Sequence, residues 1–313
     1  MACTEARTPR AAASEVTMLN ASRYRRLLRL SLAAALVLVA SRSYAQPFSS
    51  DHKAKVLMFG DSILFESKHY ARWALELGGK AEVRAFATSG SALCAWFPGS
   101  GSSEFWIPTD IATQVREWKP DAVVFQFWGN ANFLDISPCM GDLQRGDPDH
   151  YRRYREDAVA AMWHVLRGAL HAEIATPKVY WVLQPPDPYR PEIPRLIDEG
   201  YRQLATDDTW STVRFADAGD SVSLSQRGGG RYDYTRWLPC LPGWESVENN
   251  TCRATGYGGL NIVRDGSDAN QGIHFCPEDG RIDDDGACSV YSSGALRYGL
   301  GIANPILDEL GLR

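Results

Sequence analysis

Short apolar runs alternate with amphipathic stretches along most of this 313-residue chain. The strand candidates are the five mainly apolar runs 55–59, 81–87, 122–127, 179–183 and 213–216. The helix candidates carry apolar residues at helical spacing: 62–77, 108–118, 150–170, 191–205 and 292–310, the last with Pro305 as a possible break. Buried strands that alternate with helices are typical of a parallel sheet covered on both faces. We therefore expect a doubly wound, flavodoxin-like three-layer α/β/α sandwich with a five-stranded, mainly parallel sheet.

The alternation stops between residues 218 and 270. This stretch holds three consecutive glycines, two tryptophans and two cysteines, and it has no sustained period of either kind. Loops of this length are uncommon unless they are functional or cross-linked. We therefore expect a single domain over residues 46–313 that contains a long loop-rich insertion.

The N-terminal 45 residues have the features of an export signal. Four arginines between residues 23 and 29 precede an apolar run over 30–40, and Ser43-Tyr44-Ala45 matches a cleavage site. The run is about half of the ~20 residues that cross a bilayer, so a membrane anchor is the less favoured reading. We predict a signal peptide that is removed after Ala45, with the mature protein secreted or periplasmic.

Charge argues against a nucleic-acid partner. The first 45 residues hold seven Arg and two Glu, so the remaining chain has 26 basic and 36 acidic residues and a formal charge of −10. Proteins that bind nucleic acid usually present a basic patch or stripe. We expect no nucleic-acid partner and a monomeric protein.

Cysteine usage agrees with export. Six cysteines follow the signal segment, at positions 94, 139, 240, 252, 276 and 288. An even number in an exported chain indicates disulfides, and the sequence-local pairs Cys240–Cys252 and Cys276–Cys288 would leave Cys94 with Cys139. Zinc is the competing reading, but no C-x-x-C occurs and one His lies nearby. We expect no metal and no cofactor.

The candidate nucleophile is Ser62. The first strand candidate leads directly into Gly60-Asp61-Ser62 and then a helix, which places the serine at the carboxyl edge of the sheet. Its N–H lies at a helix N-terminus, where an oxyanion can be stabilised. The tripeptide recurs at Gly219-Asp220-Ser221, but that copy leads into a glycine run, so we interpret Ser221 as a loop residue.

Three further blocks follow in order: Ser89-Gly90-Ser91, Gly129-Asn130 and Gly272-Ile273-His274. Together with Ser62 they resemble the SGNH hydrolases, also called the GDSL esterase/lipase family, over the whole mature chain. The resemblance implies that Ser62 is the nucleophile and His274 the general base. It also implies an oxyanion hole formed by the N–H groups of Ser62 and Gly90 and the side-chain amide of Asn130.

The chain departs from the family pattern at the residue that orients the histidine. The family usually has an aspartate three residues before the histidine, and this chain has Gln271. Three readings stay open: Gln271 or a backbone carbonyl orients His274, Asp268 or Asp265 supplies the carboxylate, or the protein mainly binds and catalyses poorly.

These residues predict a secreted serine ester hydrolase that acts through an acyl-enzyme. Loop aromatics such as Trp96, Trp128 and Trp237 could stack on sugar rings, and no long apolar segment is available to form a lid. We therefore favour short acyl esters, such as acetyl esters of extracellular carbohydrate or small molecules. The alternatives are an O-acyltransferase acting on a glycan hydroxyl and a weakly catalytic glycan-binding module.

Overall fold

The computed structural model describes residues 52–99, 109–130, 148–252, 260–264, 272–276 and 288–313. The expected signal segment lies outside the described residues. Residues 51–313 form one compact unit. None of the helices in the described ranges has the length and apolar character needed to cross a membrane.

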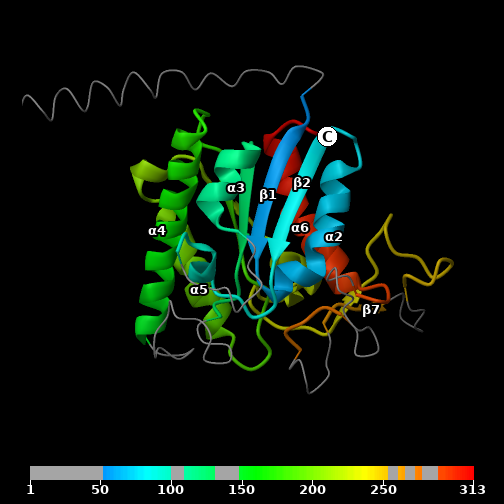
Figure 1. Ribbon diagram of the computed structural model, residues 1–313. Coiled ribbons are helices and arrows are strands. Elements are labelled where there is room, and N and C mark those ends of the chain that lie inside the picture. Colours follow the sequence, from blue (N-terminus) through cyan, green and yellow to red (C-terminus); the bar gives the residue numbers. More distant parts are fainter. Residues whose placement is uncertain (1–51, 100–108, 131–147, 253–259, 265–271, 277–287) are drawn as a thin grey trace, which may run out of the picture. The chain divides into compact units, whose positions relative to one another are not determined.

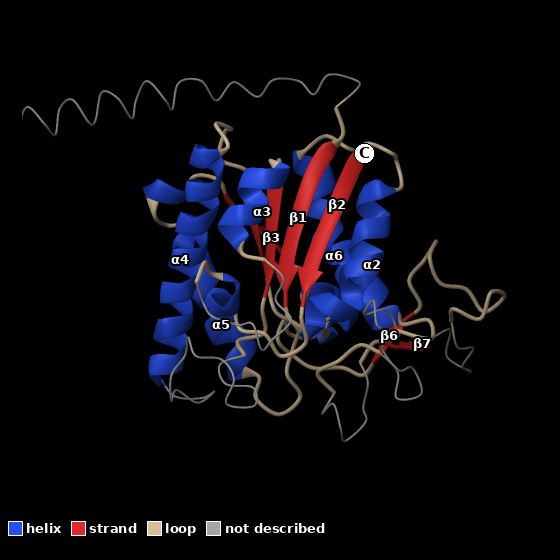
Figure 2. Cartoon of the chain, viewed as in Figure 1, coloured by secondary structure: helices blue, strands red, loops and turns tan. Residues whose placement is uncertain are grey.

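A five-stranded parallel sheet forms the centre of the molecule (Figures 1 and 2). Its order is β2-β1-β3-β4-β5. The strands are β1 (Ala54–Gly60), β2 (Ala81–Ala87), β3 (Ala122–Gln126), β4 (Lys178–Val182) and β5 (Val213–Ala216). All four pairings are parallel, so each strand ends at the same edge. This order is that of flavodoxin-like doubly wound sheets, which confirms the expected fold class.

Helices cover both faces of the sheet. They are α2 (Ser62–Glu76), α3 (Ile111–Trp118), α4 (Pro148–His171), α5 (Glu192–Leu204) and α6 (Ser293–Glu309). Alternate side chains of β1 point to opposite faces: Leu57 and Phe59 pack with α3, α4 and α5, and Val56 and Met58 pack with α2 and α6. Figure 1 shows these two helix layers on either side of the strands. Helix α6 continues through Pro305, so the possible break there does not occur.

The loop-rich insertion contains more regular structure than its sequence indicated. In its described part, two 3-10 turns (Asp220–Val222 and Leu224–Arg227) precede β6 (Trp237–Pro239), which pairs with β7 (Leu260–Ile262) in an antiparallel two-stranded sheet. The Cys240–Cys252 disulfide lies between these strands in the sequence. Three-residue strands give too little pattern to be recognised from sequence.

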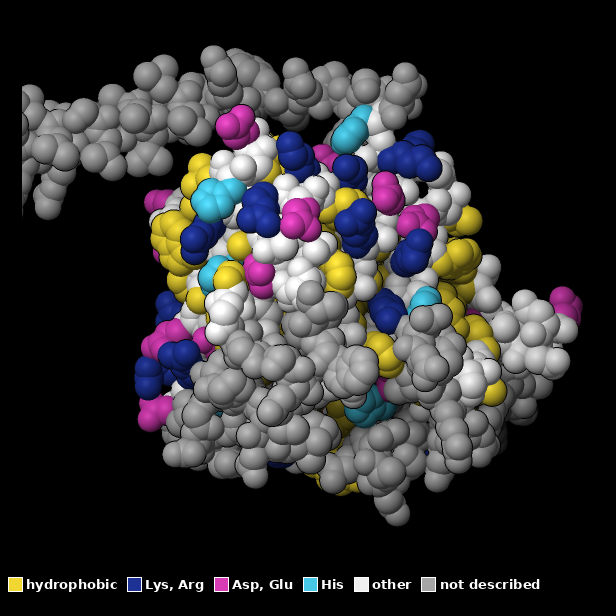
Figure 3. All heavy atoms as spheres, in the orientation of Figure 1, with side chains coloured by type: hydrophobic (Ala, Val, Ile, Leu, Met, Phe, Trp, Pro, Cys, Tyr) yellow, Lys and Arg dark blue, Asp and Glu magenta, His cyan; other side chains and the backbone are white. Residues whose placement is uncertain are grey.

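Basic and acidic side chains are interspersed over the face of the molecule that Figure 3 shows. Several of the described ion pairs join two exposed side chains, such as Arg152 with Glu156. Such pairs contribute little to stability, about 0–1 kcal/mol each. The fold is therefore held mainly by the two apolar layers on either side of the sheet.

Candidate active site

Ser62 is the first residue of α2, directly after the turn that ends β1. Gly60 permits this turn, because a Cβ at that position would lie 2.4 Å from the Cβ of Leu64 and 2.7 Å from the carbonyl oxygen of Gln126. Asp61 caps the helix: its Oδ1 accepts a hydrogen bond from the N–H of Ile63 at 3.0 Å. The N–H of Ser62 is one of the first-turn donors that have no acceptor within the helix.

The second block lies against this turn. The N–H of Thr88 donates to the carbonyl oxygen of Gly60 at 3.1 Å, and the hydroxyl of Ser91 donates to the same oxygen at 3.3 Å. Gly90 lies between these two contacts with a φ of +77°, a conformation that favours glycine. The described structure therefore brings Gly90 to the turn that carries Ser62.

The third block is tied to Asp61. Asp61 Oδ2 accepts hydrogen bonds from the N–H of Trp128 and from Nδ2 of Asn130, the latter at 3.1 Å. Nδ2 of Asn130 also lies 3.4 Å from the carbonyl oxygen of Ser91. One buried carboxylate thus caps the helix and positions the asparagine, so the Asp of the Gly-Asp-Ser motif has a structural role beyond capping.

The fourth block meets α2 at a residue that the sequence analysis did not select. Nδ1 of His274 lies 2.7 Å from Oε1 of Glu66, and the N–H of Phe275 donates to Oε2 of Glu66 at 2.7 Å. The Glu66 side chain is fully buried, whereas that of His274 is 22% exposed. Residues four apart share one face of a helix, so Glu66 lies one turn beyond Ser62 on the same face.

Glu66 controls the protonation of His274. Burial lowers the pKa of the imidazole, but the hydrogen bond that Nδ1–H donates to Glu66 and the negative charges of Glu66 and Asp61 raise this pKa, while the charge of Arg264 lowers it. The net result is a pKa above the ordinary value for histidine. With the carboxylate accepting from Nδ1–H, the neutral ring carries its lone pair on Nε2, as a general base requires.

One disulfide and one hydrogen bond fix the segment that carries His274. Cys276 is bonded to Cys288, and the carbonyl oxygen of Phe275 accepts a hydrogen bond from the hydroxyl of Ser292 at 2.7 Å. Ser292 is also the N-cap of α6. The histidine segment is therefore anchored to α6 on one side and to α2 on the other.

The three predicted disulfides have different outcomes. The pairs Cys240–Cys252 and Cys276–Cys288 are both formed, as predicted. Cys94 is disulfide-bonded as well. Its predicted partner, Cys139, lies outside the described residues, so that pairing stays a prediction.

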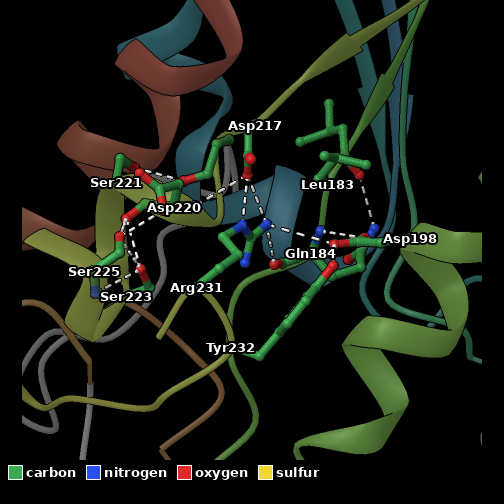
Figure 4. A network of polar contacts seen from close by, with 12 residues as sticks. Leu183, Gln184, Asp198, Asp217, Asp220, Ser221, Ser223, Ser225, Arg231 and Tyr232 are labelled. Atoms are coloured by element: carbon green, nitrogen blue, oxygen red, sulfur yellow. Dashed lines mark hydrogen bonds and ion pairs between the residues drawn. The ribbon is translucent and has the colours of Figure 1, made fainter. Parts of the chain in front are cut away.

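Ser221, in the second copy of the tripeptide, is held by contacts with the backbone. Its hydroxyl is within hydrogen-bonding distance of the carbonyl oxygens of Ala218 and Arg297. A Cβ at Gly219 would lie 2.0 Å from the carbonyl oxygen of Gln184, so this glycine permits close packing against the end of β4. Figure 4 shows Ser221 in the polar network around Arg231, which pairs with Asp217 and Asp198.

Asp268 and Gln271, the two candidates for orienting the histidine, lie outside the described residues, as does Asp265. Their assignment stays a prediction. Glu66 was missed because the apolar residues alone indicated the buried face of this helix, and a charged residue on that face adds no hydrophobic signal. The available signal was its position four residues after the candidate nucleophile.

Within the described ranges, no group of three or more His, Cys, Asp or Glu side chains is placed to hold a metal ion. The turn after β1 and the first turns of α2 instead hold a serine, several N–H donors and a buried carboxylate, and this carboxylate contacts the histidine. This set can transfer a proton from a hydroxyl and stabilise an oxyanion.

Comparisons with known proteins gave likenesses in structure alone. No protein-family model matches the chain, and no curated protein matches its sequence. A carbohydrate acetylesterase family member from Sinorhizobium meliloti aligns at 15% identity with a TM-score of 0.43, over 82% of this chain and 99% of its own. The C-terminal catalytic domain of peptidoglycan O-acetyltransferase A from Streptococcus pneumoniae aligns at 13% identity with a TM-score of 0.40, over 83% and 96%. The esterase EstA from Pseudoalteromonas sp. aligns at 10% identity with a TM-score of 0.32, over 52% and 77%.

Likenesses at this level do not establish a shared activity. The resemblance to the SGNH hydrolases rests on this chain's own features. Four sequence blocks occur in the family's order; the first three lie around the turn after β1, and the fourth contacts α2 through Glu66.

Proposed function

We propose that this protein is a serine ester hydrolase that acts through an acyl-enzyme, with Ser62 as nucleophile and His274 as general base. One observation carries the proposal: Glu66, four residues after Ser62 on α2, lies 2.7 Å from Nδ1 of His274. This contact brings the histidine to the helix face that carries the serine. A nucleophile, a base and a group that orients the base are the three parts of a catalytic triad.

In the first half of the reaction, Oγ of Ser62 attacks the carbonyl carbon of the ester while Nε2 of His274 takes the hydroxyl proton. The tetrahedral intermediate then expels the alcohol, which receives that proton from the imidazolium. In the second half, water attacks the acyl-enzyme, His274 accepts its proton, and Ser62 recovers a proton as the acid leaves.

The oxyanion would be held by the N–H groups of Ser62 and Gly90 and by Nδ2 of Asn130. The bond from Asn130 to Asp61 supports this assignment, because it fixes the amide beside the helix N-terminus before any substrate binds. The other Nδ2 proton, which faces the carbonyl oxygen of Ser91 at 3.4 Å, is the one that would turn to the oxyanion. Each such donor is worth about 2.7–4 kcal/mol to the transition state.

We assign the orienting carboxylate to Glu66. It is fully buried, it contacts Nδ1 directly, and its second oxygen binds the N–H of the next residue, so the imidazole and its backbone are held by the same group. The main argument for a weakly catalytic binding module was that position 271 lacks a carboxylate. With Glu66 as the orienting group, that argument no longer applies.

The proposed substrates are short acyl esters, such as acetyl esters of carbohydrate or small molecules. Ser62 is 8% exposed and Trp128, which precedes Asn130 by two residues, is 3% exposed, so the reacting serine lies in a confined place. Transfer to a sugar hydroxyl instead of water would use the same acyl-enzyme. We further propose that the protein is exported, which the two formed disulfides support because such bonds persist in oxidising compartments.

Covalent labelling tests the proposal directly. The purified protein is incubated with a serine-directed sulfonyl fluoride, and the modified peptide is located by mass spectrometry. We expect one adduct on Ser62, in parallel with loss of hydrolysis of a chromogenic acetyl ester. Modification of Ser221 with Ser62 unlabelled, or hydrolysis that persists in fully labelled protein, would contradict it.

The two disulfides offer a matched pair for a further prediction, since each joins cysteines 12 residues apart. Removing Cys276–Cys288 by a double Cys→Ser substitution should lower kcat by about 10²-fold, because the segment that carries His274 loses an anchor. Removing Cys240–Cys252 in the same way should lower the melting temperature and leave kcat nearly unchanged. Steady-state kinetics and thermal unfolding measure both; equal effects on kcat would contradict the positional argument.

A further inference from the structure

Arg264 is a fully buried cation next to the proposed base. It follows β7 and has 0% exposure. Burial lowers its pKa to about 10, although the charges of Tyr234, Glu66, Tyr298 and Asp187 raise it, so the guanidinium is positively charged at neutral pH. A buried charge is costly, and a position that retains one without a direct ion pair calls for an explanation.

The contacts of Arg264 are directed at backbone and at an aromatic ring. Its Nε donates to the carbonyl oxygen of Gly272 at 3.0 Å, and its Nη2 donates to the carbonyl oxygen of Pro186 at 3.1 Å. Its guanidinium carbon lies 4.7 Å from the centre of the Phe275 ring. Among the described residues its Nη1 has no hydrogen-bond partner, and no carboxylate forms an ion pair with its guanidinium.

These contacts lie on both sides of His274. Gly272 precedes the histidine by two residues, and Phe275 follows it directly. Pro186 lies in the loop that follows β4, and β4 is a strand of the central sheet. A planar guanidinium can hold two carbonyls in fixed directions and pack its face on an aromatic ring, which a lysine cannot do.

We propose that Arg264 is a positioning residue for the general base: by binding the carbonyls of Gly272 and Pro186 and packing on Phe275, it fixes the segment that presents His274 to Ser62. The inference rests on the proposed function for its kinetic consequences, but its effect on the imidazole can be measured without turnover. Arg264 touches neither Ser62 nor the imidazole in the described contacts, so it acts through the backbone and through its charge.

The positive charge of Arg264 also lowers the pKa of His274. The groups that act on His274 are Glu66 and Asp61, which stabilise the imidazolium, and Arg264, which opposes it. Removing the Arg264 cation should therefore raise the pKa of His274 and move the acid limb of the kcat/KM profile to higher pH. Removing the Glu66 carboxylate should move the same limb in the opposite direction.

The test compares Arg264→Met, Arg264→Lys and Arg297→Met. Arg297 is the matched control, because it is a buried arginine that binds Glu245 at 2.7 Å and the carbonyl oxygen of Pro239. Neither partner belongs to the segment 272–276 that carries His274. The measurements are kcat and KM on a chromogenic acetyl ester and the pKa of His274 by NMR titration, with its signal assigned by loss in His274→Gln.

We expect Arg264→Met to lower kcat by about 10²-fold with a much smaller change in KM, and to raise the pKa of His274. Arg264→Lys should leave that pKa near the parent value and lower kcat, since the charge remains and the two-carbonyl contact is lost. Arg297→Met should lower thermal stability without moving the pKa of His274.

Full kcat in Arg264→Lys, or an unchanged pKa of His274 in folded Arg264→Met, overturns the inference. If Arg264→Met does not fold, Arg264→Lys decides the matter through kcat. A parent protein without ester hydrolysis in which Arg264→Met still raises the pKa of His274 supports the positioning role and overturns only the proposed function.

Discussion

Replacing Ser62 by Ala should abolish turnover of a chromogenic acetyl ester, with a loss of about 10⁶-fold in kcat. The physical reason is that Ser62 is the hydroxyl residue at the N-terminus of α2, one helical turn before Glu66, the residue that holds the proposed base. The residual rate would reflect stabilisation of the oxyanion by the remaining N–H donors. Because Ser62 lies at a helix terminus that Asp61 caps, the variant should keep its fold and melting temperature.

The matched control is Ser221→Ala, which changes the same residue in the second Gly-Asp-Ser copy. Its hydroxyl contacts two carbonyl oxygens, so its loss should cost about 1 kcal/mol in the free energy of unfolding and leave kcat unchanged. Kinetics and thermal unfolding of both variants separate catalysis from stability. Turnover that survives Ser62→Ala and disappears in Ser221→Ala would reverse the assignment of the nucleophile.

Replacing Glu66 by Gln should lower kcat by about 10⁴-fold, because a neutral amide can hold the imidazole in the wrong tautomer and cannot stabilise the imidazolium. The acid limb of the kcat/KM profile should also move. Glu66 raises the pKa of His274, so its removal lowers that pKa, and the base becomes active from a lower pH. A pH profile of the residual activity measures this shift.

Asp268→Asn and Gln271→Ala are the matched comparison for Glu66→Gln, since each tests a residue that the sequence alone offered as the orienting group. We expect both to retain most of the parent kcat. If Asp268→Asn instead costs orders of magnitude and Glu66→Gln costs little, the carboxylate comes from the downstream loop and the 2.7 Å contact is structural.

The sequence predicted the fold well because the strands of a covered parallel sheet are mainly apolar runs that alternate with amphipathic helices. The predicted run 81–87 coincides with β2, and 213–216 coincides with β5. The predicted helix ends differ from the observed ones by at most three residues, because helix ends fray and apolar spacing does not mark them. The strands β6 and β7 were missed because three residues show no period.

The site was only partly predictable, and α2 shows why. The apolar residues at helical spacing included Trp73 and Leu77, yet these are 42% and 65% exposed. The buried face of the helix also includes Ser62, Glu66 and Ser67. Glu66 lies three residues after Ile63 and four before Tyr70, on the face that the apolar spacing indicated, but a charged residue within that face carries no hydrophobic signal. A buried carboxylate needs a partner, and only the tertiary structure shows that this partner is His274.

The contact between Glu66 and His274 spans 208 residues of sequence, whereas Ser62 and Glu66 are neighbours on one helix. Two members of the proposed triad therefore come together as soon as α2 forms, and the third arrives only when the C-terminal part of the chain docks. Closing a chain segment of this length is slow compared with forming a helix. During refolding, helical signal should return first and esterase activity last, so recovered turnover would report the final docking step of the chain.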